Sequence, residues 1–167
     1  LKLLRQKTNK PAKTVIIQEE GGNPNAIAKV TRLAQELVLE ASRCHREPCD
    51  FSELMLGVEC GGSDATSGLV ANPVLGLISD RVVGLGGVAM FSETIEMVGA
   101  EYVLAERAKD PAVGRKIIDY VHGREREQIA AGGNIRKSQP SPGNQAGGIT
   151  TLEEKSLGCI HKGGHTP

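Results

Sequence analysis

The sequence is poor in aromatic residues, which make up only 2% of its 167 positions and include no tryptophan. Its core must therefore consist mainly of aliphatic side chains, because the largest apolar groups are almost absent. Hydrophobic residues account for 39% of the chain and charged residues for 24%, a balance typical of a globular protein and not of a disordered one. The length is that of one ordinary domain.

An excess of charge of either sign is also absent. Twenty Lys and Arg residues balance twenty Asp and Glu residues, so no basic field is available to hold a phosphate backbone, and nucleic acid is not an expected partner. No apolar run approaches the roughly 20 residues of a membrane-spanning helix, and the first residues lack the layout of a signal peptide. We therefore expect no membrane association and a cytoplasmic location.

The cysteines and histidines lack the spacing of a metal module or a disulfide framework. The four cysteines stand at positions 44, 49, 60 and 159, and we interpret them as reduced thiols. The four histidines, at positions 45, 122, 161 and 165, show no metal-ligand spacing. Phosphate-binding glycine motifs linked to a strand are missing too, so nucleotide binding has little support.

Short apolar runs alternate with helical patterns along the chain. Three apolar runs stopped by glycine or a turn residue predict buried strands at 14–18, 54–59 and 88–91. Apolar residues spaced three and four apart predict helices, whose starts are marked by capping residues or proline. These helices are expected from Asn25 to about Arg46, from Asn72, from Ser92 to about Ala108, and from Asp110 onward.

Strands that alternate with helices of this length predict parallel pairing with right-handed crossovers. The expected fold class is therefore α/β, with a Rossmann-like, open, mainly parallel sheet and flanking helices over residues 1–131. Residues 132–167 are expected to form a Gly/Pro-rich active-site loop and a short helix capped by Thr151. Both ends of the chain suggest a fragment of something longer.

Ligands of such sheets bind beyond the carboxyl ends of the strands. This rule points to the loops 19–24, 59–72 and 92–96 as candidate binding regions.

The segment Glu59-Cys60-Gly61-Gly62-Ser63-Asp64 is the richest in reactive groups. It places a thiol, a hydroxyl and two carboxylates beside glycines that allow close approach of a ligand to the backbone. The structural alternative is a tight turn in which Ser63 and Asp64 satisfy local backbone donors, and the residues alone do not decide. Cys60 has three interpretations, a metal ligand, a nucleophile or a small buried apolar residue, of which the last is the most common.

Glu93 and Glu96 follow a predicted strand at the start of a helix. Acidic side chains there complement the helix dipole without any catalytic task. The functional alternative makes Glu93 a metal ligand or general base, with Glu101 on the solvent side.

The Gly- and Pro-rich stretch 140–148 has the composition of a linker. A glycine-rich loop before a helix also presents backbone amides to an anion, such as a substrate carboxylate. Lys155 is then either a further cation of that site or a solvated charge.

Three long motifs, in order, resemble the altronate and galactarate dehydratase family. They are Gly57-Val58-Glu59-Cys60-Gly61-Gly62-Ser63-Asp64 with Ser67-Gly68 and Ala71-Asn72-Pro73; Phe91-Ser92-Glu93-Thr94 with Glu96 and Gly99-Ala100-Glu101; and Pro140-Ser141-Pro142-Gly143-Asn144 with Ala146-Gly147-Gly148, Thr150-Thr151 and Glu154-Lys155-Ser156-Leu157-Gly158. Ile95 departs from the pattern, which often has proline there. Family members are longer, so the resemblance implies a central fragment, inactive by itself, whose partners are the missing segments of its own chain.

The resemblance implies a hydro-lyase that converts a sugar acid of the altronate or galactarate type to a 2-keto-3-deoxy acid. A base removes the hydrogen next to the carboxylate, the neighbouring hydroxyl leaves, and a divalent metal, Fe2+ or Mn2+, stabilises the enolate. A related branch implies instead the large subunit of a sulfolactate sulfo-lyase. A non-catalytic Rossmann-like binding module and a small Cys/His metal module are the alternatives from other classes.

Carried over position by position, the resemblance also implies the pocket residues. Glu93 and Asp64 receive catalytic roles in proton transfer. Substrate binding is implied for Gly61, Gly62, Ser63, Ser92, Asn144 and Lys155, and metal contact for Cys60, Asp64, Glu93 and Glu96. The sugar acid is the expected ligand, and the sequence leaves a homo-oligomer open.

Overall fold

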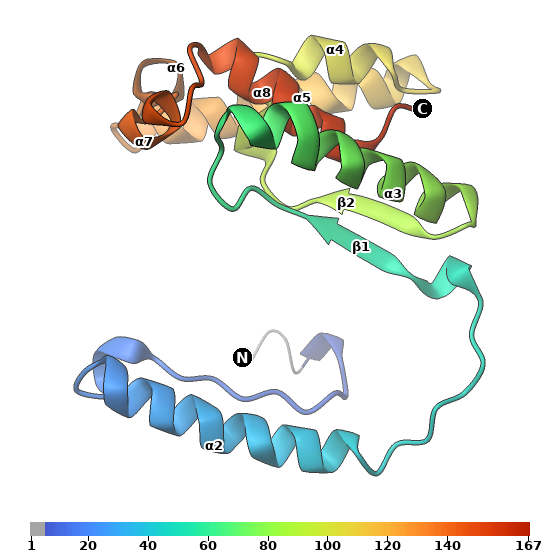
Figure 1. The fold of residues 1–167 in the computed structure, drawn as a ribbon, viewed down its shortest axis with the longest axis vertical. Helices are drawn as coiled ribbons and strands as arrows, with labels where there is room; N and C mark the ends of the chain where they lie inside the picture. The colour runs from blue at the N-terminus through green and yellow to red at the C-terminus, as the bar shows by residue number, and fades with distance from the viewer. Residues whose placement is uncertain (1–5) are drawn as a thin grey trace. The chain divides into compact units, whose positions relative to one another are not determined.

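A computed structural model describes residues 6–167, and the chain divides into two compact units, residues 1–48 and 49–167 (Figure 1). The first unit contains one long helix, α2 (Asn23–Ala41), with Pro24 in its first turn, where the fixed φ of proline suits a helix. A 3-10 turn at Ile17–Glu19 precedes α2. Within α2, only Ala26 is buried, and Ile27 is 66% exposed.

The second unit contains a small parallel sheet. Strand β1 (Met55–Val58) pairs with β2 (Val88–Phe91), with Met55 opposite Val88 and Val58 opposite Phe91. Helix α3 (Asn72–Gly84) connects the two strands. The predicted strands at 54–59 and 88–91 and the helix from Asn72 are therefore confirmed.

The predicted Rossmann-like sheet is wrong, because β1 and β2 are the only strands in residues 6–167, and the chain is mainly helical. The predicted strand at 14–18 is an irregular segment that leads into the 3-10 turn, and Ile16 and Ile17 are half-exposed. A β-branched run favours extended backbone, but a strand also needs a partner for its hydrogen bonds. After β2 the chain forms helices that pack on one another and contribute no further strand.

Five α-helices follow β2. They are α4 (Glu101–Glu106), α5 (Pro111–Ala130), α6 (Ile135–Ser138), α7 (Pro142–Ala146) and α8 (Leu152–Ile160). Asp110 and Thr151 cap α5 and α8 as predicted, each accepting a backbone N–H of the first turn. Helices α4 and α5 pack side by side, and α8 contacts α3 (Figure 1).

The helix predicted from Ser92 to Ala108 is interrupted. A 3-10 helix at Thr94–Met97 ends before Gly99, whose φ of 101° lies in the left-handed region, and α4 begins only at Glu101. Glycine adopts this φ without the steric penalty of a side chain, so the chain turns at this point. The turn directs Glu96 and Glu101 into different surroundings.

The core of the second unit is aliphatic, as the composition predicts. It contains Met97, Val98, Ala100, Val121, Leu152 and Ile160, with Phe91, Ile95, Leu104 and Ile135 packed against it. All four cysteines are free thiols. In the described part of the chain, no helix has the length and apolar character needed to cross a membrane.

Helix α3 holds the last residues of the chain closely. Gly76 lies so near the segment after α8 that a Cβ at this position would stand 2.1 Å from the carbonyl oxygen of His161. The hydroxyl of Ser79 donates to the carbonyl of Lys162 at 2.6 Å. The carboxylate of Asp80 accepts the amides of His165 and Thr166 and the Thr166 hydroxyl.

Replacing Gly76 by alanine is expected to lower the free energy of unfolding by roughly 1–3 kcal/mol, because the new methyl group must push α3 away from the backbone at His161. Chemical denaturation of the protein measures this loss. Gly84→Ala is the matched control in the same helix: beyond its chain neighbours and the backbone of the helix itself, no atom lies within 4 Å of its added Cβ. Stability should therefore stay equal or rise by up to about 1 kcal/mol. Equal effects at the two positions would contradict the close approach.

Asp80 provides a pH test of the same contact. Burial opposes its ionisation, but hydrogen bonds from Thr166 and His165 and the nearby His165 imidazole lower its pKa from 3.8 to about 2. Asp80 therefore stabilises the folded protein fully above pH 3.8, and this stabilisation is lost as the pH falls through about 2. We expect Asp80→Asn to be less stable than the wild type near neutral pH, with a difference that shrinks in acid. A difference independent of pH in denaturation experiments would refute this assignment.

Candidate active site

The segments that follow β1 and β2 lie together at the carboxyl edge of the sheet. The backbone amide and the hydroxyl of Ser92 both donate to the carbonyl of Val58, each at 3.1 Å. Two of the three loops indicated by the strand-end rule therefore meet, as parallel strands require. The third loop, 19–24, belongs to the first unit and follows no strand.

A buried ion pair lies directly behind these loops. The carboxylate of Glu96, in the 3-10 helix after β2, pairs with the ammonium of Lys162, and the two side chains are 5% and 1% exposed. The second carboxylate oxygen of Glu96 accepts the backbone amide of Cys60 at 2.9 Å. Glu96 thus joins the segments after both strands to the residues that follow α8.

The pKa of Glu93 is raised above its ordinary value of 4.5. The main cause is a hydrogen bond to the neighbouring carboxyl of Glu96, followed by burial and by the charges of Glu96 and Glu59, while Lys162 acts in the opposite direction. Two adjacent carboxyl groups resist ionising together. Glu93 therefore retains its proton at a higher pH than an ordinary glutamate, which suits a group that accepts and returns protons.

Asn144 and Lys155 form a second polar arrangement beside the loop after β1. Asn144 is buried in α7, and its amide donates to the carbonyl of Ser63 at 2.8 Å. Its side-chain oxygen accepts from Ser141 and, at 2.9 Å, from the ammonium of Lys155. Lys155 also donates to the side-chain oxygen of Gln139 at 2.7 Å. The Gly- and Pro-rich stretch is thus built into the fold by a capping box between Ser141 and Asn144.

Several of these groups line a cavity of about 180 Å³. Its lining comprises Cys60, Glu93, Ile95, Glu96, Ile135, Gln139, Leu152, Lys155 and Ser156. Lys155 also lines a neighbouring cavity of about 480 Å³, together with Ser63 and Asp64. Acidic, basic and apolar groups therefore meet in one recess at the strand ends, the arrangement expected of an active site.

The structure brings only some of the predicted site residues into this recess. Cys60, Glu93, Glu96 and Lys155 line it, and Ser63 and Asn144 adjoin it, with 3.1 Å between the Ser63 hydroxyl and the Cys60 sulfur. Gly61 and Gly62 border a separate cavity of about 40 Å³.

Asp64 and Ser92 are occupied with local contacts. One carboxylate oxygen of Asp64 accepts from the Thr66 hydroxyl at 2.7 Å and the Ser67 amide at 2.8 Å, and these hydrogen bonds lower its pKa. Asp64 lines the larger cavity. Ser92 is exposed and its hydroxyl donates to Val58.

The four residues implied as metal ligands do not form a ligand set by themselves. In residues 6–167 no three His, Cys, Asp or Glu side chains gather in an arrangement that could hold a metal ion. Both oxygens of Glu96 are occupied by Lys162 and Cys60. Glu93 and the Cys60 thiol remain at the recess, and two donors are fewer than a divalent cation takes. A metal here needs further ligands from beyond these residues or from the substrate.

Sequence reasoning missed two residues of the site, Lys162 and Gln139, and misplaced Glu101, which lies outside the recess. Lys162 is buried against Glu96, and Gln139 binds Lys155, yet neither stands in a pattern that signals a site. Glu101, expected on the solvent side, is 2% exposed. Its carboxylate accepts the amide of Gly99 at 2.6 Å and contacts His122 and Arg136, which compensates for its removal from water.

Comparison with known proteins identifies the class. Residues 51–167 match the family model described as D-galactarate/altronate dehydratase, C-terminal, and the chain belongs to this family of sugar-acid dehydratases. It is 50% identical to altronate dehydratase of Escherichia coli (strain K12) over 71% of this chain and 24% of that protein. It is 36% identical to galactarate dehydratase (L-threo-forming) of the same organism over 92% of this chain and 29% of that protein.

A third relative acts on a different type of molecule. The chain is 41% identical to (2R)-sulfolactate sulfo-lyase subunit beta of Chromohalobacter salexigens over 93% of this chain and 40% of that protein. The chain thus spans between 24% and 40% of the length of these three relatives. The family resemblance predicted from the motifs is confirmed.

The raised pKa of Glu93 leads to a stability prediction. Because the folded protein disfavours the ionised form, Glu93 opposes folding increasingly as the pH rises above its ordinary pKa of 4.5. Glu93→Gln should therefore be more stable than the wild type at neutral pH and equally stable in acid, as measured by denaturation at a series of pH values. Glu106→Gln, an exposed position of α4, is the control. A Glu93→Gln variant without a stability gain at neutral pH would show that Glu96 does not raise the pKa of Glu93.

Proposed function

We propose that the chain forms part of the active site of a hydro-lyase that dehydrates a sugar acid of the altronate or galactarate type to a 2-keto-3-deoxy acid. The observation that carries the proposal is the recess at the strand ends, where Glu93, with its raised pKa, and the cation Lys155 line the same cavity. Dehydration next to a carboxylate needs such a pair, a base for the α-hydrogen and a cation for the charge that develops.

Lys155 is suited to hold the carboxylate of the acid. An ammonium group has three N–H donors, and Gln139 and Asn144 accept two of those of Lys155. Within residues 6–167 the third N–H has no acceptor, so it can donate to a carboxylate oxygen of the substrate. The charge on that oxygen grows when the α-hydrogen leaves, so the interaction strengthens in the transition state.

Glu93 is suited to move the proton. Its carboxylate takes the α-hydrogen, and the electrons of the broken C–H bond form an enolate. The enolate then expels the hydroxyl group of the neighbouring carbon, which leaves as water with the proton that Glu93 has gained. The resulting enol rearranges to the 2-keto acid. A pKa raised by Glu96 makes Glu93 a stronger base than an ordinary glutamate.

A divalent cation, Fe2+ or Mn2+, remains part of the proposal as a cofactor that would neutralise the enolate. Glu93 and Cys60 are the donors that this chain offers at the recess. Its remaining ligands would have to come from residues outside 6–167 or from the acid itself.

A sulfo-lyase is the second candidate, because the sulfolactate sulfo-lyase subunit matches 93% of this chain. The same proton abstraction serves both reactions. They differ in the leaving group, which is sulfite in one and water in the other, and in the pocket that accepts it.

The test is product formation by the full-length protein from galactarate, altronate and sulfolactate, with and without added Fe2+. We expect a 2-keto-3-deoxy acid from a sugar acid, and a loss of roughly 100-fold or more in kcat for Glu93→Gln, which removes the base. Glu106→Gln is the control and should retain activity.

Two outcomes would change the assignment. Sulfite release from sulfolactate, without turnover of either sugar acid, would favour the sulfo-lyase. Absence of product from all three acids would favour a non-catalytic binding role.

A further inference from the structure

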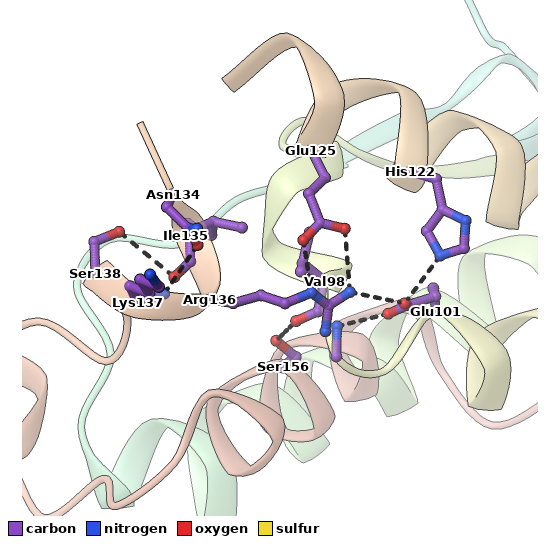
Figure 2. Close-up of polar contacts among 11 residues, drawn as sticks. Val98, Glu101, His122, Glu125, Asn134, Ile135, Arg136, Lys137, Ser138 and Ser156 are labelled. Carbon is purple, nitrogen blue, oxygen red and sulfur yellow. Dashed lines mark hydrogen bonds and ion pairs between the residues drawn. The ribbon is translucent and has the colours of Figure 1, made fainter. Parts of the chain in front are cut away.

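Helix α6 carries an arginine whose network of charged side chains lies outside the cavity of about 180 Å³. Arg136 of α6 binds both carboxylate oxygens of Glu125, through Nε at 2.6 Å and Nη2 at 3.1 Å. The same Nη2 lies 3.4 Å from Glu101. Figure 2 shows Arg136 reaching between the two carboxylates, with His122 on the other side of Glu101.

Glu101 makes this network a junction of three helices. It is the first residue of α4, and its carboxylate is contacted by His122 of α5 and Arg136 of α6. Its side chain is 3% exposed. A buried carboxylate is tolerated only when donors surround it, so the three helices must keep their relative positions for Glu101 to stay satisfied.

Helix α6 depends on such anchors, because it has only four residues. A helix this short is unstable in isolation and owes its position to tertiary contacts. Asn134 caps it by accepting the amide of Lys137 at 3.2 Å, and Ile135 packs against the core. Arg136 supplies its ionic attachment to α4 and α5.

The first residue of α6 and the residue that ends it border the candidate site. Ile135 and Gln139, one helical turn apart, both line the cavity of about 180 Å³. Gln139 accepts a hydrogen bond from Lys155 at 2.7 Å. A shift of α6 would therefore move a cavity wall and one of the two groups that orient the Lys155 ammonium.

We infer that Arg136, held by Glu101 and Glu125, is a positioning residue that fixes α6 so that Gln139 orients Lys155 in the candidate site. The inference rests on the proposed function for its catalytic consequence. Arg136 does not line the recess and acts only through α6. Arginine suits this task better than lysine, because its planar guanidinium group can bind Glu125 through two nitrogens and also contact Glu101.

The first experiment measures hydrogen exchange of the full-length protein as wild type, Arg136→Ala and Arg124→Ala. Arg124 is the matched control, since it is an exposed arginine of α5 that pairs only with Glu127 among the described residues. We expect faster exchange at residues 135–145 in the Arg136 variant and no change there in the Arg124 variant. Unchanged exchange in Arg136→Ala would overturn the inference whatever the protein catalyses.

The second experiment is a double-mutant cycle in kcat/KM with the acid that the wild type turns over. Arg136→Ala should lower kcat/KM roughly tenfold, in keeping with the cost of a misplaced catalytic group, and Arg136→Lys should recover part of the loss. In a Gln139→Ala background the same Arg136→Ala change should lower kcat/KM little further, because the hydrogen bond from Lys155 to Gln139 is already absent.

The results separate the two proposals. An equal loss on Arg136→Ala in both backgrounds means a general structural role and refutes the positioning of Lys155 through Gln139. A wild type that turns over none of the acids refutes the proposed hydro-lyase. In that case the hydrogen-exchange data still test, independently of catalysis, whether Arg136 anchors α6.

Discussion

The buried ion pair between Glu96 and Lys162 is the interaction on which the second unit of the chain depends. Charges so fully removed from water are stable only when each is paired and hydrogen-bonded. Glu96 also accepts the amide of Cys60, and the carbonyl of Lys162 accepts the hydroxyl of Ser79 in α3. The pair thereby fixes both strand ends, α3 and the segment after α8 to one another, and it places a second carboxyl group beside Glu93.

The sequence predicted best those helices that begin with a capping residue or a proline. Asp110-Pro111 and Thr151 before Glu154 mark α5 and α8, because capping depends on residues within one turn. Pro73 marks the first turn of α3, but Asn72 does not cap this helix, because its side chain donates to the carbonyl of Gly158. The short helices α6 and α7 have capping residues too, Asn134 and Ser141, but the glycines and prolines of the surrounding stretch suggested a loop. The prediction of an open sheet was wrong, because an apolar run such as 14–18 does not show whether a partner strand exists.

The candidate site was partly predictable, because some of its residues follow directly after the predicted strands. The strand-end rule and the family motifs brought Cys60, Glu93 and Glu96 together, since the positions of the strands determine where the following residues lie. The partner of Glu96 is 66 positions away in the sequence, and a lysine beside glycines resembles a solvated charge. The burial of Glu101 could not be predicted from the sequence either, because its partners on α5 and α6 become its neighbours only after folding.

Lys162 neutralises Glu96 from behind the recess, so an approaching anion meets mainly the charges of Lys155 and Glu93. An acid is attracted most strongly while Glu93 is protonated and Lys155 is the dominant charge. Removal of the α-hydrogen in the proposed reaction needs the opposite state, with Glu93 ionised. Capture of the acid and activation of the base are therefore opposing demands on one carboxyl group, and an enzyme of this design must release that proton after the acid has bound.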